Sequence, residues 1–534
     1  MRRLSTLRFV GVFLLAWLLP PAHAQPAKPP ATVAELRQHL ADHVAQPQFA
    51  AGALGLKVVS LESGKTIFEH NAAKLLSPAS NSKLYTVALA LDQLGGHYRI
   101  KTSLYSEKRP NPSGTLKGDL IVFGRGDPTL NARRNGGDIY MALEPLVIAL
   151  TQAGVKRISG DLIGDDSFIR GTPYGSGWDC DDLQAYYGAE ISALTINDNV
   201  VQLSVNAAEH EGDACKLALS PPTVYLILSN RTETVAKGGP RSITFHRPLG
   251  ENVVYVFGQM PLDSTNFTDD VTIHNPAGLF IGFFKEALAR NGIKVGGKLR
   301  TANWLDRQAK PLDFDKLVEL GSVESPPLRD IAREIMKPSQ NLYTDLVLAH
   351  VGALTQERWS PTRRENSNAS QRAGSETGAP IPPRSLETSE EAGIRQLSAF
   401  LEKAGLARGD VHFEEGSGLS RNNLTTPNAT VALLKFMSTH PEAAAYLDSL
   451  PIAGVDGTLR NRLKGTLAAG NVRAKTGTLR WANSLSGHVT TAAGERLIFS
   501  IMLNRYAAPD LQHSGRAEID KIAVTLAEFT GRSD

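Results

Sequence analysis

The amino-acid sequence predicts a mixed α/β (α+β) protein in which helix-and-strand segments at both ends enclose a large β-rich region. Helical and strand patterns alternate near the two ends, and many short strands with Gly, Asp and Pro turns follow one another from about Tyr98. With 42% hydrophobic and 21% charged residues among 534, the chain has globular composition and the length of several domains.

The first 24 residues have the features of a secretory signal peptide. Three arginines accompany the apolar run 9–19, and Ala-His-Ala at 22–24 offers a small-residue cleavage pattern. An uncleaved membrane anchor is the alternative, although the apolar run is short for a bilayer. We therefore predict that residues 1–24 direct export to the periplasm and that a Pro-rich linker, 25–31, follows them.

The charge balance and the motifs exclude several classes of function. The formal charge of +3 is accounted for by the three arginines of the predicted signal peptide, so the mature chain has no global attraction to nucleic acid. No later segment approaches 18 consecutive apolar residues, so no stable membrane span is expected after signal cleavage. The chain has no P-loop and no clustered metal ligands, so we expect no cofactor and no metal.

The N-terminal part predicts a helix, a hairpin and a second helix. Apolar residues recur at one-turn spacing over 32–44, and two β-rich runs flank a Ser-Gly turn over 55–70. Residues 81–94 predict an apolar helix. In the β-rich region that follows, 278–291 predicts a closing helix, and 317–321 returns to strand character.

The C-terminal part resumes helices and strands around one polar interruption. Residues 328–354 are predicted to be mostly helical. Residues 358–391 are polar, rich in Pro, Ser and Gly and nearly free of apolar residues, so we expect a disordered surface loop. A helix over 393–405, three strands and a helix over 516–529 complete the chain.

The two cysteines, Cys180 and Cys215, both lie in the β-rich region. In an exported protein an even pair favours a disulfide, which would close a loop of about 35 residues. Two separate buried thiols are the alternative. We expect the disulfide.

Ser80 and Lys83 form a Ser-x-x-Lys pattern at the start of a predicted helix. Residues three apart on a helix lie on one face, and burial at the head of an apolar helix lowers the pKa of a lysine. Lys83 can then take the proton of the Ser80 hydroxyl, which makes Ser80 a candidate nucleophile. By itself the pattern also fits a capped helix with an exposed lysine.

A Ser-x-Asn pattern is formed by Ser339 and Asn341, with Gln340 between them. Three other Ser-x-Asn matches occur, but this one follows a proline and precedes an apolar helical stripe. Ser339 can relay protons in a cleft, and Asn341 can hold Lys83 or a substrate amide.

The run Lys475-Thr476-Gly477-Thr478 is the only Lys-Thr-Gly sequence in the chain, and it lies on a β-type segment. A strand edge can bind an extended peptide, and Lys475 and Thr476 can receive a carboxylate. We expect Gly477 to remove a side chain where the substrate backbone approaches. An exposed edge strand with a basic residue is the alternative.

The three patterns follow one another as Ser-x-x-Lys, Ser-x-Asn and Lys-Thr-Gly, on a predicted helix, a second helix and a strand. This is the motif set of β-lactamases and penicillin-binding proteins. The chain resembles a class C low-molecular-mass penicillin-binding protein of the D-alanyl-D-alanine carboxypeptidase/endopeptidase family, which carries a large insertion between the first two motifs. It departs from the family at Gln340, where Asp is frequent, and in the additional loop 358–391. The supporting segments are 124–130, 160–162, 192–194, 416–421 and 454–459.

The resemblance implies a penicillin-binding transpeptidase-like, β-lactamase-like catalytic domain with a central antiparallel sheet between helices. Residues 32–98 and 306–534 would build it, and 99–305 would form one or two inserted β-rich domains. The implied activity is that of a serine-type D-Ala-D-Ala carboxypeptidase on peptidoglycan stem peptides, inhibited by β-lactam antibiotics, and endopeptidase activity on cross-links is equally compatible. Ser80 would attack the penultimate D-alanine carbonyl, with the backbone N–H groups of Ser80 and Thr478 as the oxyanion hole.

The resemblance also implies a substrate pocket. A Trp–Asp–aromatic stretch approaches the cleft in the family, and 178–187 is the comparable segment here. Asp182 would pair with the ammonium of diaminopimelate, and Tyr187 would cover its methylene stem. An acidic surface turn capped by aromatic residues is the alternative.

Two other functions remain open at this point. A β-lactamase shares the three motifs, but the long insertion argues against it. A catalytically silent cell-wall scaffold is the other, and the intact motif set argues against it.

Overall fold

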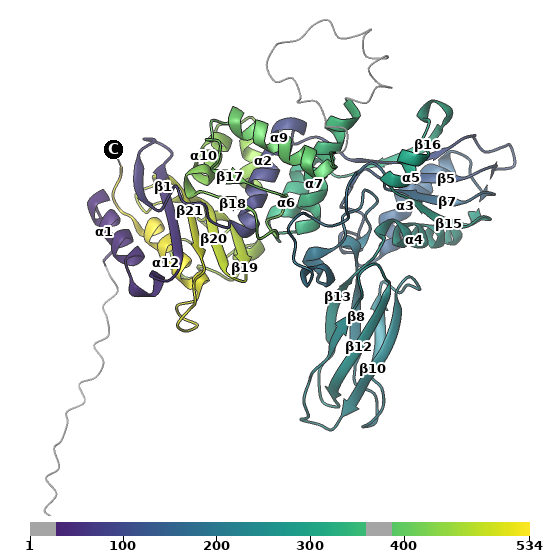
Figure 1. Ribbon diagram of the computed structural model, residues 1–534, viewed down its shortest axis with the longest axis horizontal. Helices are drawn as coiled ribbons and strands as arrows, with labels where there is room; N and C mark the ends of the chain where they lie inside the picture. The colour runs from purple at the N-terminus through teal and green to yellow at the C-terminus, as the bar shows by residue number, and fades with distance from the viewer. Residues whose placement is uncertain (1–27, 359–386, 534) are drawn as a thin grey trace, which may run out of the picture.

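The protein is described by a computed structural model that covers residues 28–358 and 387–533. Two segments far apart in the sequence build one sheet, and the region between them forms a second body beside it (Figure 1). The predicted signal peptide 1–24 lies outside the described residues, as does the part of the predicted loop at 359–386. None of the described helices is both long and apolar enough to cross a membrane.

The first body contains a five-stranded antiparallel sheet of order β19-β20-β21-β1-β2. Ala53 of β1 lies opposite Asn504 of β21, so the N-terminal segment joins the C-terminal strands in the middle of the sheet. β19 is an edge strand. The strands are β1 (Ala53–Ser60), β2 (Thr66–His70), β19 (Arg473–Leu479), β20 (Ala482–Thr490) and β21 (Arg496–Asn504).

Helices cover both faces of this sheet (Figure 1). α1 (Val33–Val44) and α12 (Gly515–Glu528) pack on one face through a cluster of buried apolar side chains. The other face holds a larger helical layer around α2, in which every residue from Ser82 to Leu91 is buried. The helices of this layer are α2 (Ser82–Leu94), α6 (Leu328–Met336), α7 (Asn341–Arg358), α9 (Ser389–Lys403), α10 (Pro427–Ser438) and α11 (Ala443–Ser449).

Residues 328–354 are mostly helical as predicted, but the structure differs from the prediction at two places. The helix expected over 328–354 is broken between Met336 and Asn341, because Ser339 adopts a left-handed backbone with φ of 68°. The end of the expected loop 358–391 is helical, because Thr388 begins α9 with a capping box in which it exchanges hydrogen bonds with Glu391.

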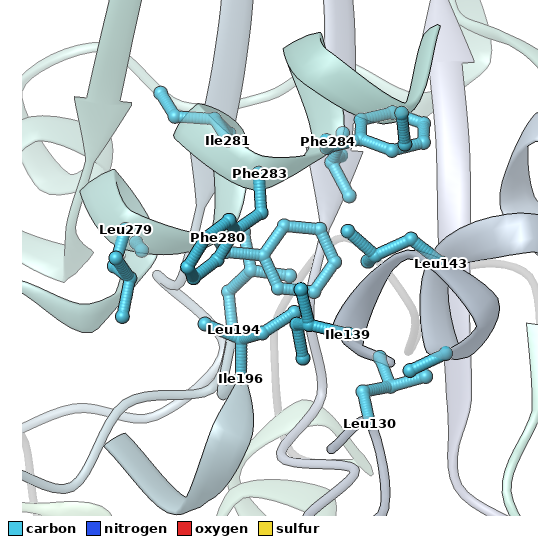
Figure 2. Close-up of a cluster of buried hydrophobic side chains, with 14 of the residues drawn as sticks. Leu130, Ile139, Leu143, Leu194, Ile196, Leu279, Phe280, Ile281, Phe283 and Phe284 are labelled. Atoms are coloured by element: carbon cyan, nitrogen blue, oxygen red, sulfur yellow. The ribbon is translucent and has the colours of Figure 1, made fainter. Parts of the chain in front are cut away.

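The inserted body is built on a mixed five-stranded sheet of order β15-β7-β5-β3-β16. Its core packs α4 (Pro276–Arg290) against α3 (Ile139–Gln152), and Figure 2 shows Phe280, Phe283 and Leu143 in this core. The helix expected over 278–291 is α4, but α3 was not predicted, so the body is less purely β than expected. The strands are β3 (Lys101–Ser106), β5 (Leu120–Phe123), β7 (Leu162–Asp165), β15 (Leu299–Ala302) and β16 (Val318–Glu324).

A β-structured extension projects from this body (Figure 1). It consists of two three-stranded sheets, β13-β8-β9 and β10-β12-β11. Its strands are β8 (Val200–Asn206), β9 (Lys216–Ser220), β10 (Ile227–Val235), β11 (Thr244–His246), β12 (Val253–Pro261) and β13 (Phe267–Thr272).

Short strands and one short helix lie elsewhere in the protein. They are β4 (Thr115–Leu116), β6 (Arg157–Ile158), β14 (Lys294–Val295), α5 (Trp304–Ala309), β17 (Val411–His412) and β18 (Leu424–Thr425).

The predicted boundary of the insertion at 305 is too early. The strand expected over 317–321 does not return to the first sheet, because β16 pairs along its length with β3 of the inserted sheet. The inserted body therefore extends through Glu324. Strand pairing between segments so far apart has no signal in a local pattern.

The predicted disulfide is also wrong, because both cysteines are free. Cys180 is exposed in the segment before the 3-10 turn η4 (Asp182–Gln184). Cys215 is buried in the extension, where its backbone N–H donates to Thr232 Oγ1 at 3.0 Å and its Sγ lies 3.7 Å from Thr234 Oγ1. The thiols are therefore separate, as the alternative had it, but only Cys215 is buried and Cys180 is exposed.

Candidate active site

The three sequence motifs meet in a cleft of about 1030 Å³. Ser80, Ser339 and Asn341 line it together with Thr476 and Thr478, so residues from η2 (Ala79–Asn81), the α6–α7 link and β19 converge. Asp182 and Tyr187 of the inserted body also line it. Lys83 and Lys475 lie directly behind these residues and are fully buried.

Ser80 lies in the single 3-10 turn η2 immediately before α2. The preceding residue, Ala79, has φ of 47°, a left-handed conformation that costs about 1–3 kcal/mol for a non-glycine residue. Two glycines make room for this turn: a Cβ on Gly418 would lie 1.9 Å from the Ala79 oxygen, and one on Gly477 would lie 2.4 Å from the Pro78 oxygen. The nucleophile candidate is therefore held in a strained turn by close backbone packing.

Lys83 contacts Ser80 from one turn along the chain, as the i, i+3 spacing predicts. Its Nζ lies 3.1 Å from Ser80 Oγ and donates to Asn341 Oδ1 and to the Ser417 carbonyl, both at 2.6 Å. Burial lowers the pKa of Lys83 to about 8, against an opposing effect of Asp345 and Glu415. A substantial fraction of this lysine is therefore neutral near pH 8 and can accept a proton.

Glu415 organises the loop that supplies the Ser417 carbonyl, a role that no sequence pattern indicated. The Glu415 carboxylate is fully buried and accepts from the backbone N–H groups of Ser417 at 2.8 Å and Gly418 at 2.7 Å, and from Asn423 Nδ2 at 2.7 Å. Burial and then the neighbouring Glu415 raise the pKa of Asp345 well above its ordinary value. The raised pKa favours the neutral form of Asp345 beside Glu415.

Ser339 and Lys475 form a second serine–lysine contact across the cleft. Lys475 Nζ donates to Ser339 Oγ at 2.8 Å and to the Thr476 carbonyl at 2.7 Å. The pKa of Lys475 is far below its ordinary value, first because the group is buried and second because Lys83 is near. The left-handed backbone of Ser339 turns its hydroxyl toward β19, which a residue inside a continuous helix does not do.

The outer edge of β19 is open where the Lys-Thr-Gly-Thr run lies. The N–H of Ala474 donates outward to the Pro451 carbonyl at 3.0 Å. Backbone groups alternate sides along a strand, so those of Thr476 and Thr478 point outward as well. The segment at Pro451 pairs with β19 only as far as Ala474. The outward backbone groups of Thr476 and Thr478 can therefore pair with an extended peptide in the cleft.

The reason predicted for Gly477 is wrong. Its missing side chain does not face the substrate, because a Cβ there would lie 2.1 Å from Ser484 Oγ and 2.4 Å from the Pro78 oxygen. Ser484 Oγ itself donates to that oxygen at 2.6 Å. The glycine instead lets β19 pack closely against the turn that carries Ser80.

Asp182 and Tyr187 lie on the wall that the inserted body contributes. Asp182 is 5% exposed, and its carboxylate lies 3.4 Å from Nη2 of Arg421, which also contacts Asp179 at 3.1 Å. Burial raises the pKa of Asp182, and Arg421 opposes this shift. The Tyr187 carbonyl accepts from Asn341 Nδ2 at 2.9 Å, which connects this wall to the Ser-x-Asn motif.

Comparison with known proteins places the chain among peptidases. The model of the D-Ala-D-Ala carboxypeptidase 3 (S13) family matches residues 36–378 and 382–526. The chain belongs to the S13 family. A D-alanyl-D-alanine carboxypeptidase of Actinomadura sp. (strain R39) is 32% identical to this S13 peptidase over 512 residues, which cover 94% of this chain and 86% of that protein.

A sequence and a solved structure from Haemophilus influenzae agree with this result. The D-alanyl-D-alanine carboxypeptidase DacB is 25% identical to this S13 peptidase over 464 residues, 86% of this chain and 87% of that protein. The crystal structure of penicillin binding protein 4 (dacB) superposes with a TM-score of 0.73 at 24% identity, covering 93% of this chain and 98% of that one. The predicted family is confirmed by the family match, and the predicted fold class by this structural likeness.

Proposed function

We propose that this S13 peptidase is a serine-type D-alanyl-D-alanine carboxypeptidase/endopeptidase whose acyl-enzyme forms on Ser80. The observation that carries this proposal is the distance of 3.1 Å between Ser80 Oγ and the Nζ of buried Lys83, whose pKa is lowered to about 8. A neutral amine at hydrogen-bond distance is the base that a serine nucleophile needs. The names of its relatives, D-alanyl-D-alanine carboxypeptidases, supply the substrate class.

The acylation step uses the groups on the two sides of Ser80. Lys83 takes the hydroxyl proton while Ser80 Oγ bonds to the carbonyl carbon of the penultimate D-alanine. The N–H groups of Ser80 and Thr478 bind the resulting oxyanion. The amide C–N bond then breaks, and the leaving amine takes the proton that Lys83 accepted, relayed by Ser339, whose hydroxyl is hydrogen-bonded to Lys475 at 2.8 Å. Lys83 is thereby neutral again.

Deacylation completes the cycle with water. Water adds its oxygen to the acyl carbon while Lys83 accepts a water proton, the bond between the acyl carbon and Ser80 Oγ breaks, and Lys83 passes the proton to Ser80 Oγ as the shortened peptide leaves. The group released earlier, during acylation, is a terminal D-alanine in the carboxypeptidase reaction. In the endopeptidase reaction it is the stem peptide freed from the cross-link. Its carboxylate meets the hydroxyl groups of Thr476 and Thr478, with Lys475 behind them.

β-Lactams and peptidoglycan stem peptides are the proposed ligands, and the periplasm is the proposed location. A structure similar in fold, penicillin binding protein 4 of H. influenzae, has been solved complexed with a β-lactam. The predicted signal peptide supports export to the compartment that contains peptidoglycan.

The deciding experiment locates the acyl group. After treatment with penicillin, mass spectrometry of a protease digest is expected to find the adduct on the peptide containing Ser80, and Ser80→Ala is expected to carry none. A long-lived adduct also separates this enzyme from a β-lactamase, which deacylates quickly. An adduct on another serine, or no adduct at all, would sink the proposal.

The pH dependence of acylation follows from the state of Lys83. Its neutral form is the active one, so the acylation rate constant is expected to rise between pH 6 and 9 with a midpoint near the pKa of about 8. Glu415 raises the pKa of Lys83, so Glu415→Gln is expected to move the midpoint to lower pH. Stopped-flow acylation at constant ionic strength measures both. A rate that falls with rising pH over this range contradicts a neutral Lys83 base.

The proposed pocket for diaminopimelate is tested at Asp182. Asp182→Asn is expected to lower turnover of a diaminopimelate-containing peptide roughly tenfold, because a charge-assisted contact with the substrate ammonium is lost. Turnover of a small D-alanyl-D-alanine ester should hardly change. Asp179→Asn is the matched control, since Asp179 contacts the same Arg421 but is exposed and does not line the cleft. Equal losses on both substrates would mean that Asp182 supports the fold only.

A further inference from the structure

The cleft has a second charged wall that the reaction described above does not use. Arg460, Arg480 and Arg516 line the same cleft as Thr476 and Thr478. All three arginines are exposed, and none of their guanidinium groups has an ion pair or hydrogen bond with another residue in the described ranges 28–358 and 387–533. Three cations without a counter-ion among the described residues thus line the substrate cleft.

Strand geometry places this wall on the α12 side of the sheet. Ala474 packs into the apolar cluster shared with α12. Side chains alternate between the faces of a strand, so Thr476 and Thr478 point to the same face as Ala474. Arg516 lies in the first turn of α12, and Arg480 lies in the turn that joins β19 to β20, so both flank this face.

The loop that carries Arg460 is fixed to both neighbours. It follows the 3-10 turn η8 (Gly457–Leu459), and the hydroxyl groups of Thr458 and Thr476 are hydrogen-bonded at 2.8 Å. Arg462, two residues later, pairs with Asp520 of α12 at 2.7 Å. Arg462 is therefore neutralised and anchors the loop, whereas Arg460 is held in place with its charge uncompensated.

These positions are electrostatically unfavourable in the free enzyme. The first turn of a helix carries positive partial charge, so a cation at Arg516 is disfavoured there. Like charges gathered without counter-ions also repel one another. An anion among the three guanidinium groups removes both costs, and carboxylates match guanidinium geometry through paired hydrogen bonds.

The opposite wall has a different character. Asp182 and Tyr187 lie there beside Asn341, and the cation of that wall, Arg421, is already paired with Asp179 and Asp182. A peptide lying along β19 and cleaved at its centre therefore presents its two halves to unlike walls. The acyl half meets the acidic and aromatic wall, which leaves the arginine wall to the half that is released.

We propose that Arg460, Arg480 and Arg516 form a subsite for a released peptide that carries several carboxylates, such as the stem peptide that is freed when a cross-link is cleaved. This inference rests on the proposed function and specifies its substrate. A terminal D-alanine has one carboxylate, which the hydroxyl groups of Thr476 and Thr478 can bind. The additional cations favour cleavage of cross-links over removal of a terminal D-alanine.

The test compares two substrates that share the same acyl half. One is a cross-linked muropeptide dimer, and the other is an uncross-linked pentapeptide ending in D-alanyl-D-alanine. In the variant R460Q/R480Q/R516Q, the ratio of kcat/KM for the dimer to that for the pentapeptide is expected to fall about tenfold or more. Arg109→Gln is the control, because Arg109 is an exposed arginine of the inserted body outside the cleft and should keep the ratio.

A third substrate identifies the recognised group. It is the same dimer with the carboxylates of the released stem peptide amidated. Amidation is expected to lower kcat/KM about tenfold for the native enzyme and to have little effect in the triple variant, since the two changes remove the same interaction. Raising the ionic strength should weaken the native preference for the acidic dimer.

Two outcomes overturn the subsite: an unchanged substrate ratio in the triple variant, or an amidation effect of equal size in both enzymes. Failure of the proposed function has a different appearance. In that case the native enzyme hydrolyses neither substrate and carries no penicillin adduct on Ser80.

Discussion

Lys83→Ala is expected to lower the rate of acylation by penicillin about 10²- to 10⁴-fold, the range that a general base contributes. The side chain is fully buried, and its Nζ is hydrogen-bonded to Ser80, Asn341 and Ser417. Without it the Ser80 hydroxyl has no group to take its proton. Labelling with a fluorescent penicillin at pH 8 measures the loss.

The same substitution also affects stability, which the experiment has to separate from chemistry. Alanine leaves Asn341 Oδ1 and the Ser417 carbonyl without a donor, at a cost of about 1–3 kcal/mol for each buried group. Lys83→Met keeps the aliphatic stem and is expected to acylate as slowly as Lys83→Ala. Lys74→Ala replaces an exposed lysine near Ser80 in sequence and should label at the native rate. A folded Lys83→Met enzyme with native acylation would show that another group is the base.

Gly477→Ala is expected to lower the acylation rate about 100-fold and to destabilise the protein by about 1–3 kcal/mol. The added methyl group would lie 2.4 Å from the Pro78 oxygen and 2.1 Å from Ser484 Oγ, so β19 has to move away from the turn that carries Ser80. That movement separates the N–H of Thr478 from that of Ser80, the two groups of the proposed oxyanion hole. Acylation kinetics and thermal unfolding measure the two effects.

Gly282→Ala is the matched control for this experiment. A Cβ at Gly282 meets no atom within 4 Å, and the residue lies in α4, where alanine has the higher helix propensity. It should acylate at the native rate and be at least as stable as the native protein. If Gly477→Ala also acylates at the native rate, close packing of β19 on the Ser80 turn is not what positions the oxyanion hole.

The prediction for Gly477 illustrates how far a local pattern reaches. The sequence showed that a glycine lies in a strand beside a lysine and two threonines. It could not show which neighbour the glycine admits, because Pro78 and Ser484 reach that position from other parts of the chain. The predicted substrate contact was therefore wrong although the motif itself lines the cleft.

Charge clusters assembled from distant segments were equally hidden. Arg460, Arg480 and Arg516 come from a loop, a hairpin turn and a helix, and nothing in their spacing joins them. Glu415 was missed for the same reason, since two consecutive glutamates before a glycine-rich loop show no sign that one of them is buried. Only the contacts that enclose it reveal its five-donor environment of backbone and side-chain groups.

By itself the sequence determined the family, the motif residues and most helices and strands. Ser80 with Lys83 is a relation of one helical turn, and Lys475 to Thr478 is a relation along one strand, so the backbone period alone fixes these groups relative to each other. The tertiary structure decided that β16 belongs to the inserted sheet, that Cys180 and Cys215 stay apart, and that Ser339 turns toward Lys475. These depend on contacts between segments far apart in the chain, and no local period records such contacts.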